Sequence, residues 1–208
     1  MENDTYKTIE GISKGFFSEK GSKFYAFAYN VENEQQVKER ISELKKTYFD
    51  AKHLVYAFII GVEKKIFRYS DDGEPANSSG TPVFGQIRSS NLTNILVVVI
   101  RYFGGTKLGI PGLINAYKSA TFQALSEATI VEKTVNVFFS LVFSYEKLNF
   151  VQNTIQFFKA EIVKQNFETN CSFIIKVRKS LENIFFQEFL KNDKIKIEYV
   201  EEICKINT

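Results

Sequence analysis

The chain has 208 residues, a formal net charge of +3, and a composition that is 44% hydrophobic and 25% charged. These ordinary globular values exclude a wholly disordered chain, a collagen and a small disulfide scaffold. The two cysteines, Cys171 and Cys204, have no metal-ligand spacing and are expected to be free thiols. The polar N-terminal segment is not typical of a signal peptide, and the apolar run 95–100 is too short to cross a bilayer. We therefore expect a cytoplasmic protein without a membrane partner.

The first 130 residues predict an alternation of strands and helices. Aromatic and branched residues predict strands at 23–31, 53–61, 65–70 and 92–101. Apolar residues at helical spacing, or short apolar segments, predict helices at 34–49, 83–89 and 113–128. The branched run within 92–101 indicates a strand that is buried on both faces.

A polar step at 130–134 predicts a domain boundary, with domains at 1–132 and 133–208. The second domain is expected to contain strands at 136–144, 161–168, 171–179 and 194–200, and helices at 146–159 and 181–190. Ser180 is expected to cap the second of these helices. The order βαββαβ is typical of the ferredoxin-like arrangement, so the predicted fold class is α+β.

An acidic segment, Ser70–Pro75, contains three carboxylates within four residues: Asp71, Asp72 and Glu74. Carboxylate oxygens suit a hard cation such as Mg²⁺. They also accept backbone hydrogen bonds, so an acidic turn stabilised by Asp and Gly explains the same residues. The spacing does not match a calcium-binding EF-hand loop.

A glycine-rich segment, Arg101–Gly109, precedes the longest predicted helix. Glycines let backbone N–H groups approach a ligand, and a helix N-terminus favours an anion, with Arg101 and Lys107 adding positive charge. The alternative is a loop whose glycines serve packing. The segment matches neither a Walker A loop nor a dinucleotide fingerprint. His53, the single histidine, is more often structural than catalytic in such a context.

Basic residues with aromatic neighbours suggest RNA binding, since cations contact phosphates and aromatic rings stack on unpaired bases. The candidates in the first domain are Lys20, Lys23, Lys52, Arg68, Arg101, Tyr102, Lys107 and Lys118. A solvated basic edge is the other interpretation. No complete catalytic constellation is present, and the G-x-S-x-G motif is absent.

Four segments, taken in order and spacing, resemble the IMPACT/YigZ family: SEKGSKFYAF, AKHLVYAFIIG, YSDDGEPANSSGTPVFGQI and VVVIRYFGGTKLGIPGLINAYKSA. The resemblance covers about residues 1–130 and is of the bacterial two-domain type. It implies a first domain like the second domain of a small-subunit ribosomal protein. It also implies a second, ferredoxin-like domain resembling one of a translation elongation factor.

The resemblance implies regulation of translation, which eukaryotic relatives carry out by competing for the activator of an initiation-factor kinase. The residues that match the family motif are Lys23, His53, Asp71, Asp72, Glu74, Arg101, Tyr102, Gly104, Gly105, Gly109 and Gly112. Two departures are Pro111, where relatives commonly have glycine, and Lys107, where an apolar residue is common. Pro111 removes one N–H from an anion site, whereas Lys107 adds a charge.

We therefore expect a binding protein that is not an enzyme and that meets RNA, the ribosome or a translation-related protein. The residues expected to bind RNA or an anion are Lys23, His53, Arg68, Arg101, Tyr102, Gly104, Gly105, Lys107 and Gly109. No cofactor or metal is expected. The alternative is a Mg²⁺-dependent enzyme acting on a phosphorylated small molecule or nucleotide. It would hold the metal through Asp71, Asp72 and Glu74 and the phosphate through the loop 104–112.

Overall fold

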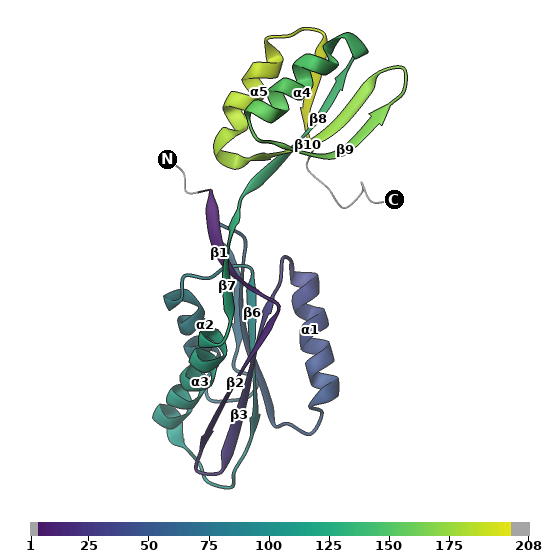
Figure 1. Cartoon of the computed structure of the whole chain (residues 1–208). Coiled ribbons are helices and arrows are strands. Elements are labelled where there is room, and N and C mark those ends of the chain that lie inside the picture. The colour runs from purple at the N-terminus through teal and green to yellow at the C-terminus, as the bar shows by residue number, and fades with distance from the viewer. Residues whose placement is uncertain (1–3, 201–208) are drawn as a thin grey trace. The chain divides into compact units, whose positions relative to one another are not determined.

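The computed structural model describes residues 4–200, which form two compact units (Figure 1). One unit comprises residues 6–133, and the other comprises residues 134–200 together with residues 4 and 5. Both are mixed α/β structures built around an antiparallel sheet. No helix within residues 4–200 has the length and apolar character needed to cross a membrane.

The unit of residues 6–133 contains a five-stranded sheet in the order β2-β3-β6-β4-β5, with every neighbouring pair antiparallel. These strands are β2 (Ile12–Glu19), β3 (Ser22–Asn30), β4 (His53–Ile60), β5 (Ile66–Ser70) and β6 (Ile95–Tyr102). A separate two-stranded sheet pairs β1 (Thr5–Glu10) with β7 (Thr129–Thr134). The strands predicted from residue 23 onwards are thus confirmed within one to three residues at each end.

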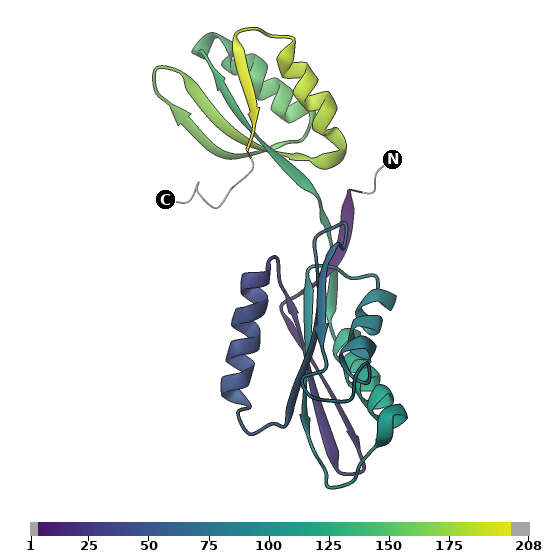
Figure 2. The ribbon, with the colours of Figure 1, turned by 180° about the vertical axis from the view of Figure 1, so that it is seen from behind.

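Helices cover both faces of the five-stranded sheet. Helix α1 (Glu34–Thr47) lies on one face, and α2 (Gly80–Ser89) and α3 (Gly109–Ser126) lie on the other, as the two opposite views show (Figures 1 and 2). Asn33 begins α1 by accepting a hydrogen bond from the Gln36 backbone N–H at 2.9 Å. A site at the start of α3 therefore lies on the face of the five-stranded sheet that α2 and α3 cover.

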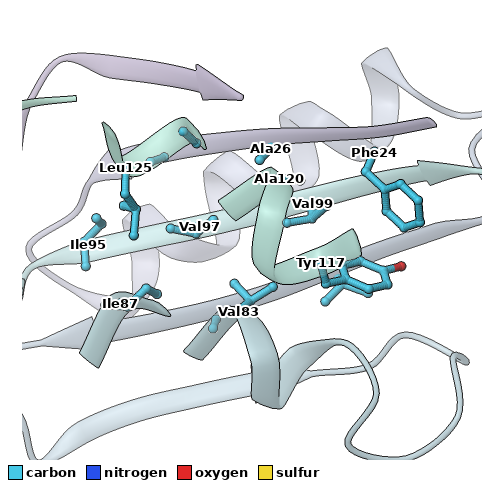
Figure 3. Close-up of a cluster of buried hydrophobic side chains, with 14 of the residues drawn as sticks. Phe24, Ala26, Val83, Ile87, Ile95, Val97, Val99, Tyr117, Ala120 and Leu125 are labelled. Carbon is cyan, nitrogen blue, oxygen red and sulfur yellow. The ribbon is translucent and has the colours of Figure 1, made fainter. Parts of the chain in front are cut away.

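Strand β6 is buried on both faces, as its run of branched residues predicts. Ile95, Val97 and Val99 pack in the core beneath α2 and α3 (Figure 3). The alternating residues Leu96, Val98 and Ile100 belong to the core beneath α1. The sequence pattern is the one expected of a parallel strand, but here two helical layers bury an antiparallel strand.

Small residues let α3 approach the sheet closely. A Cβ on Gly15 of β2 would lie 2.4 Å from the Ala124 backbone nitrogen and 2.5 Å from the Ala120 carbonyl oxygen. Both alanines are fully buried. The close approach of α3 to β2 helps fix the position of α3 and therefore of the loop that precedes it.

The unit of residues 134–200 has a four-stranded antiparallel sheet in the order β11-β8-β10-β9. Its strands are β8 (Asn136–Phe143), β9 (Glu161–Phe167), β10 (Cys171–Arg178) and β11 (Ile195–Tyr199), and its α-helices are α4 (Leu148–Phe157) and α5 (Glu182–Leu190). The chain order of these elements is βαββαβ, as expected. Side chains from both helices pack with one face of the sheet in a single apolar core.

The structure corrects the expected cap at Ser180 and bears on two further expectations, the polar segment 130–134 and the free cysteines. Ser180 does not cap α5, because residues 179–181 form a 3₁₀ turn and Leu181 takes the N-cap position without a side-chain hydrogen bond. The polar step at 130–134 lies within β7 rather than in a linker. Cys171 is a free, buried thiol, whereas Cys204 lies outside the described residues.

Candidate functional site

A cavity of about 510 Å³ lies at the N-terminal end of α3, and we call it the α3 cavity. It is lined by residues from four segments: Lys52, His53, Gly73, Glu74, Pro75, Arg101, Phe103, Lys107, Leu108, Gly109, Ile110 and Leu113. These segments are the start of β4, the acidic loop, the end of β6 with the loop that follows, and the first turn of α3. The two dense motifs of the sequence therefore meet at one place.

Strand register places the polar side chains of β4 and β6 side by side. His53 at the start of β4 lies opposite Arg101 on β6, and Arg101 lies opposite Phe24 on β3. Directly paired residues share a face of a sheet, and Phe24 belongs to the core beneath α2 and α3. His53 and Arg101 consequently lie on the face that carries the α3 cavity.

A buried ion pair forms the floor of the site. The Glu74 Oε1 atom accepts hydrogen bonds from Arg101 Nη1 at 2.5 Å and from the Tyr117 hydroxyl at 2.8 Å. Glu74 is 9% exposed and Arg101 is 5% exposed. Burial, together with the charge of Glu74, raises the pKa of Tyr117 far above its usual range, so this phenol remains a donor. Glu74 is therefore committed to protein partners.

Arg101 retains donor capacity that the protein does not use. Its Nε atom is buried and has no hydrogen-bond partner within residues 4–200. Its guanidinium carbon lies 5.5 Å from the Phe24 ring centroid and 5.7 Å from the Phe103 ring centroid. A buried donor without an acceptor costs about 1–3 kcal/mol. The side chain that lines the cavity is therefore short of an acceptor.

His53 is oriented by the backbone of the acidic loop. Its Nδ1 atom lies 2.8 Å from the Asp72 carbonyl oxygen, and its Nε2 atom lies 3.9 Å from Glu74 Oε1. Because a carbonyl oxygen only accepts, the geometry assigns a proton to Nδ1. The imidazole thus has a fixed orientation at the wall of the cavity.

The other two carboxylates of the acidic loop stabilise backbone. Asp71 accepts hydrogen bonds from the Ser79 and Gly80 N–H groups and the Ser79 hydroxyl at Oδ1, and from the Asn77 N–H at Oδ2. Burial raises the pKa of Asp71, but these hydrogen bonds outweigh it and lower the pKa below its ordinary value. Asp72 Oδ2 accepts from the Leu54 N–H at 2.7 Å.

The three carboxylates thus serve three different sets of partners. Within residues 4–200, no group of three His, Cys, Asp or Glu side chains is placed to hold a metal ion. The geometry agrees with the interpretation of this segment as an acidic turn. It does not form the Mg²⁺ ligand set of the enzyme alternative.

The glycines of the loop 104–109 have different roles. A Cβ on Gly104 would lie 1.9 Å from the Gly21 carbonyl carbon, so Gly104 permits two backbone segments to touch. Gly105 and Gly109 both adopt positive φ, at 85° and 72°. Only Gly109 of these three lines the α3 cavity, at the first position of α3.

Two lysines at the cavity have no acidic partner. Neither Lys52 nor Lys107 forms an ion pair with any residue in the described range 4–200. Lys52 Nζ lies 5.4 Å from the centroid of Phe103, a ring that is 44% exposed. We call Lys52 and Lys107 the cationic rim. An exposed aromatic surface therefore adjoins one of these two cations.

Besides Gly104 and Gly105, three residues of the expected binding set do not line the cavity, and these three lie on the other face of the sheet. Lys23 and Tyr102 are paired across β3 and β6, one residue out of phase with Arg101, and so lie on the α1 face. Arg68 lies opposite Phe58, which also belongs to the core beneath α1. A hydrogen bond to Asp50 raises the pKa of Tyr102 to about 12. The expected set is thus divided between the two faces of the sheet.

Tyr117 was not among the expected site residues, because its helical spacing marks it as core. The available signal was chemical: a fully buried tyrosine on an apolar helix face needs a partner for its hydroxyl group. Leu108 and Ile110 also line the cavity without having been singled out, as does Phe103, which the sequence suggested only as an exposed aromatic for a protein partner. Their positions depend on how the loop folds against β4, which local sequence does not specify.

Comparison with known proteins shows to which family the chain is similar. Residues 20–125 match the family model described as the Impact N-terminal domain. An "IMPACT family member" of Haemophilus influenzae is 30% identical over 171 residues, covering 81% of this chain and 83% of that protein. The "IMPACT family member YvyE" of Bacillus subtilis is 28% identical over 181 residues, covering 87% and 83%.

One solved structure supports the fold of the whole chain. The crystal structure of a hypothetical protein matches with a TM-score of 0.71 at 23% identity, covering 96% of this chain and 98% of that one. This likeness shows a shared two-domain architecture of mixed α/β type.

Proposed function

The chain belongs to the IMPACT family, and from that premise we propose that it is a non-catalytic protein of the translation apparatus that binds RNA through the α3 cavity. One observation carries the proposal: the cationic rim stands beside an exposed aromatic ring at a preformed cavity. This combination has the two chemical parts that single-stranded RNA needs, a phosphate contact and a stacking surface.

The phosphate contact follows from uncompensated charge. Lys52 and Lys107 line one cavity without an acidic partner in the described residues. Two cations that share a cavity disfavour each other, and an anionic ligand removes that cost. Such contacts position a nucleic acid without reading its sequence, and they weaken steeply with salt.

The stacking contact follows from Phe103. An exposed ring at the cavity offers a surface for an unpaired base, worth about 1–3 kcal/mol per base. Double-stranded RNA does not present its bases in this way. The proposed ligand is therefore a single-stranded segment, loop or end of RNA, including ribosomal RNA.

The translation context is proposed from the family. The resemblance implies that eukaryotic relatives regulate translation, and we propose that this chain acts in the same cytoplasmic setting, at ribosomes. A translation-related protein is the alternative partner. The α1 face, with Lys23, Arg68 and Tyr102, is not part of the proposed RNA site.

Binding as proposed here needs no metal and no cofactor. The Mg²⁺-dependent enzyme would need carboxylates that are free to coordinate. Asp71 is instead occupied by four hydrogen bonds, and Glu74 by Arg101 and Tyr117. These contacts favour binding over metal-assisted catalysis.

We also infer to which known folds the two units are related. The sheet order β11-β8-β10-β9 places the second strand of the unit at one edge and the fourth at the other, which supports a ferredoxin-like fold for residues 134–200. For residues 6–133, the kinship with the ribosomal-protein domain stays a proposal that rests on the resemblance.

Co-sedimentation of the purified protein with ribosomes and with ribosomal RNA, across a salt series, tests the proposal. We expect co-migration at low salt that falls steeply as salt rises. Binding to ribosomes that survives nuclease treatment and is insensitive to salt would instead indicate a protein partner. Free protein at every salt concentration would refute RNA binding.

A further inference from the structure

Besides the two lysines of the cationic rim, buried groups also line the α3 cavity. Arg101 lines it while 95% of the residue is buried, and its Nε donor lacks a partner within residues 4–200. Native proteins satisfy nearly all such buried groups, with ordered ligand or solvent where protein does not reach. The Nε atom itself is closed to solvent, so a ligand in the cavity would meet Arg101 through its other atoms.

The first turn of α3 forms that wall. Leu108 stands at the N-cap and makes no side-chain cap hydrogen bond, and the first turn carries no acidic residue. The N–H groups of Gly109 and Ile110 therefore keep their donor capacity, while Pro111 has none to offer. An uncapped helix N-terminus carries a partial positive charge that favours an anion.

Cationic side chains outnumber anionic ones among the residues that line the cavity. Lys52, Lys107 and Arg101 are cationic, and Glu74 is the one acidic lining residue. An internal phosphodiester carries a single negative charge. A terminal phosphate carries about −1.5 to −2 at neutral pH, together with three acceptor oxygens.

From these observations we infer that the α3 cavity binds a terminal phosphate attached to a nucleoside, with the phosphate between Arg101, the cationic rim and the start of α3, and the base on the apolar wall near Phe103. A volume of about 510 Å³ is in the range of small-ligand sites. The same chemistry is presented by a phosphorylated RNA end and by a free mononucleotide. The inference deepens the proposed function, since it rests on the same cavity.

A direct test compares oligomers that differ only in the terminal phosphate, together with a free mononucleotide. The probes are a six-nucleotide oligoadenylate with a 5′-phosphate, the same oligomer with a 3′-phosphate, the unphosphorylated oligomer, and free AMP, each titrated into the full chain. We expect at least one phosphorylated oligomer, or AMP, to bind at least about tenfold tighter than the unphosphorylated oligomer. A single charge-assisted hydrogen bond accounts for a factor of that size.

A matched pair of variants localises the effect. Ile110 lines the cavity at the second position of α3 and is 53% exposed, so a polar replacement does not disturb the core. Ile110→Glu places a carboxylate in the cavity, where the helix dipole also tolerates it. Ile130→Glu is the control, because Ile130 of β7 is 50% exposed and does not line the cavity. The preference for the terminal phosphate should disappear in Ile110→Glu and persist in Ile130→Glu.

The outcomes separate this inference from RNA binding in general. Equal affinity for phosphorylated and unphosphorylated oligomers, with binding lost when the cationic rim is neutralised, would overturn the inference and leave RNA binding intact. Binding of AMP but of no oligomer, lost in Ile110→Glu, would support the inference and refute RNA as the ligand. A phosphate preference that survives unchanged in Ile110→Glu would overturn the assignment to this cavity.

Discussion

Replacing Glu74 tests whether the acidic loop is structural. In Glu74→Ala, the guanidinium of Arg101 loses the acceptor at 2.5 Å and the hydroxyl of Tyr117 loses the acceptor at 2.8 Å. Removing one partner of a buried ion pair costs about 3–5 kcal/mol. Because Arg101 lines a cavity that water can enter, we expect a loss near the lower limit, about 3 kcal/mol.

The assay is native-state hydrogen exchange of the amides of Val97 to Val99, at the centre of the five-stranded sheet. Their opening free energy reports on the unit of residues 6–133 alone, which avoids assuming that the two units unfold together. The matched variants are Arg101→Met and the double variant Glu74→Ala/Arg101→Met.

We expect the double variant to be more stable than the sum of the single losses predicts, with a coupling of about 1–3 kcal/mol, because neither charge is left alone. A loss below about 1 kcal/mol in Glu74→Ala, together with additivity in the double variant, would refute the claim that Glu74 is held by this pair. It would also return Glu74 to the set of groups free to bind a cation.

Three further predictions concern the loops around the site. Gly104→Ala should destabilise the protein by about 3 kcal/mol or more in denaturant unfolding, because the added Cβ would overlap a neighbouring backbone. The control is Gly85→Ala, which should be neutral or stabilising, because no atom lies within 4 Å of the added Cβ. Because the folded-state pKa of Asp71 is lowered, its stabilising contribution is complete above the unfolded pKa of about 3.9 and is lost as the pH falls through the folded value. The stability difference between wild type and Asp71→Asn should therefore shrink in acid titrations below about pH 4, and a constant difference would contradict this assignment. Tyr102 should ionise at about pH 12 by ultraviolet difference titration, and Asp50→Asn should bring it back toward its ordinary value near 10.

Long apolar segments could be predicted from sequence because burial on a sheet or helix face imposes a periodic pattern. The helix after Asn33 follows that pattern, whereas the strand ending at Tyr102 was predictable from an unbroken apolar run, because both of its faces are buried. β1, β2 and β7 were missed because none has a clear apolar pattern. β7 is largely exposed, β2 is about half exposed, and β1 buries only Thr8 and Ile9 fully. Their pairing depends on long-range contacts, such as β1 with β7.

The candidate site was predictable in its chemistry but only partly in its geometry. Arg101 and Tyr102 are adjacent, so once β6 extends through both they must point to opposite faces. Alternation therefore separates one expected binding residue from the other. Which face holds Arg68 depends on the register of β5 against β4, which no local pattern specifies.

The salt dependence of single-stranded RNA binding tests the central claim most directly. Affinities of wild type, Lys52→Gln/Lys107→Gln and Arg68→Gln would be measured by fluorescence anisotropy across a salt series. Loss of two phosphate contacts should reduce the slope of log Kobs against log salt by about 1.4, at about 0.7 per contact, while Arg68→Gln on the α1 face should leave the slope unchanged. Equal slopes for wild type and the double variant, or a reduced slope in Arg68→Gln alone, would contradict RNA binding at the α3 cavity.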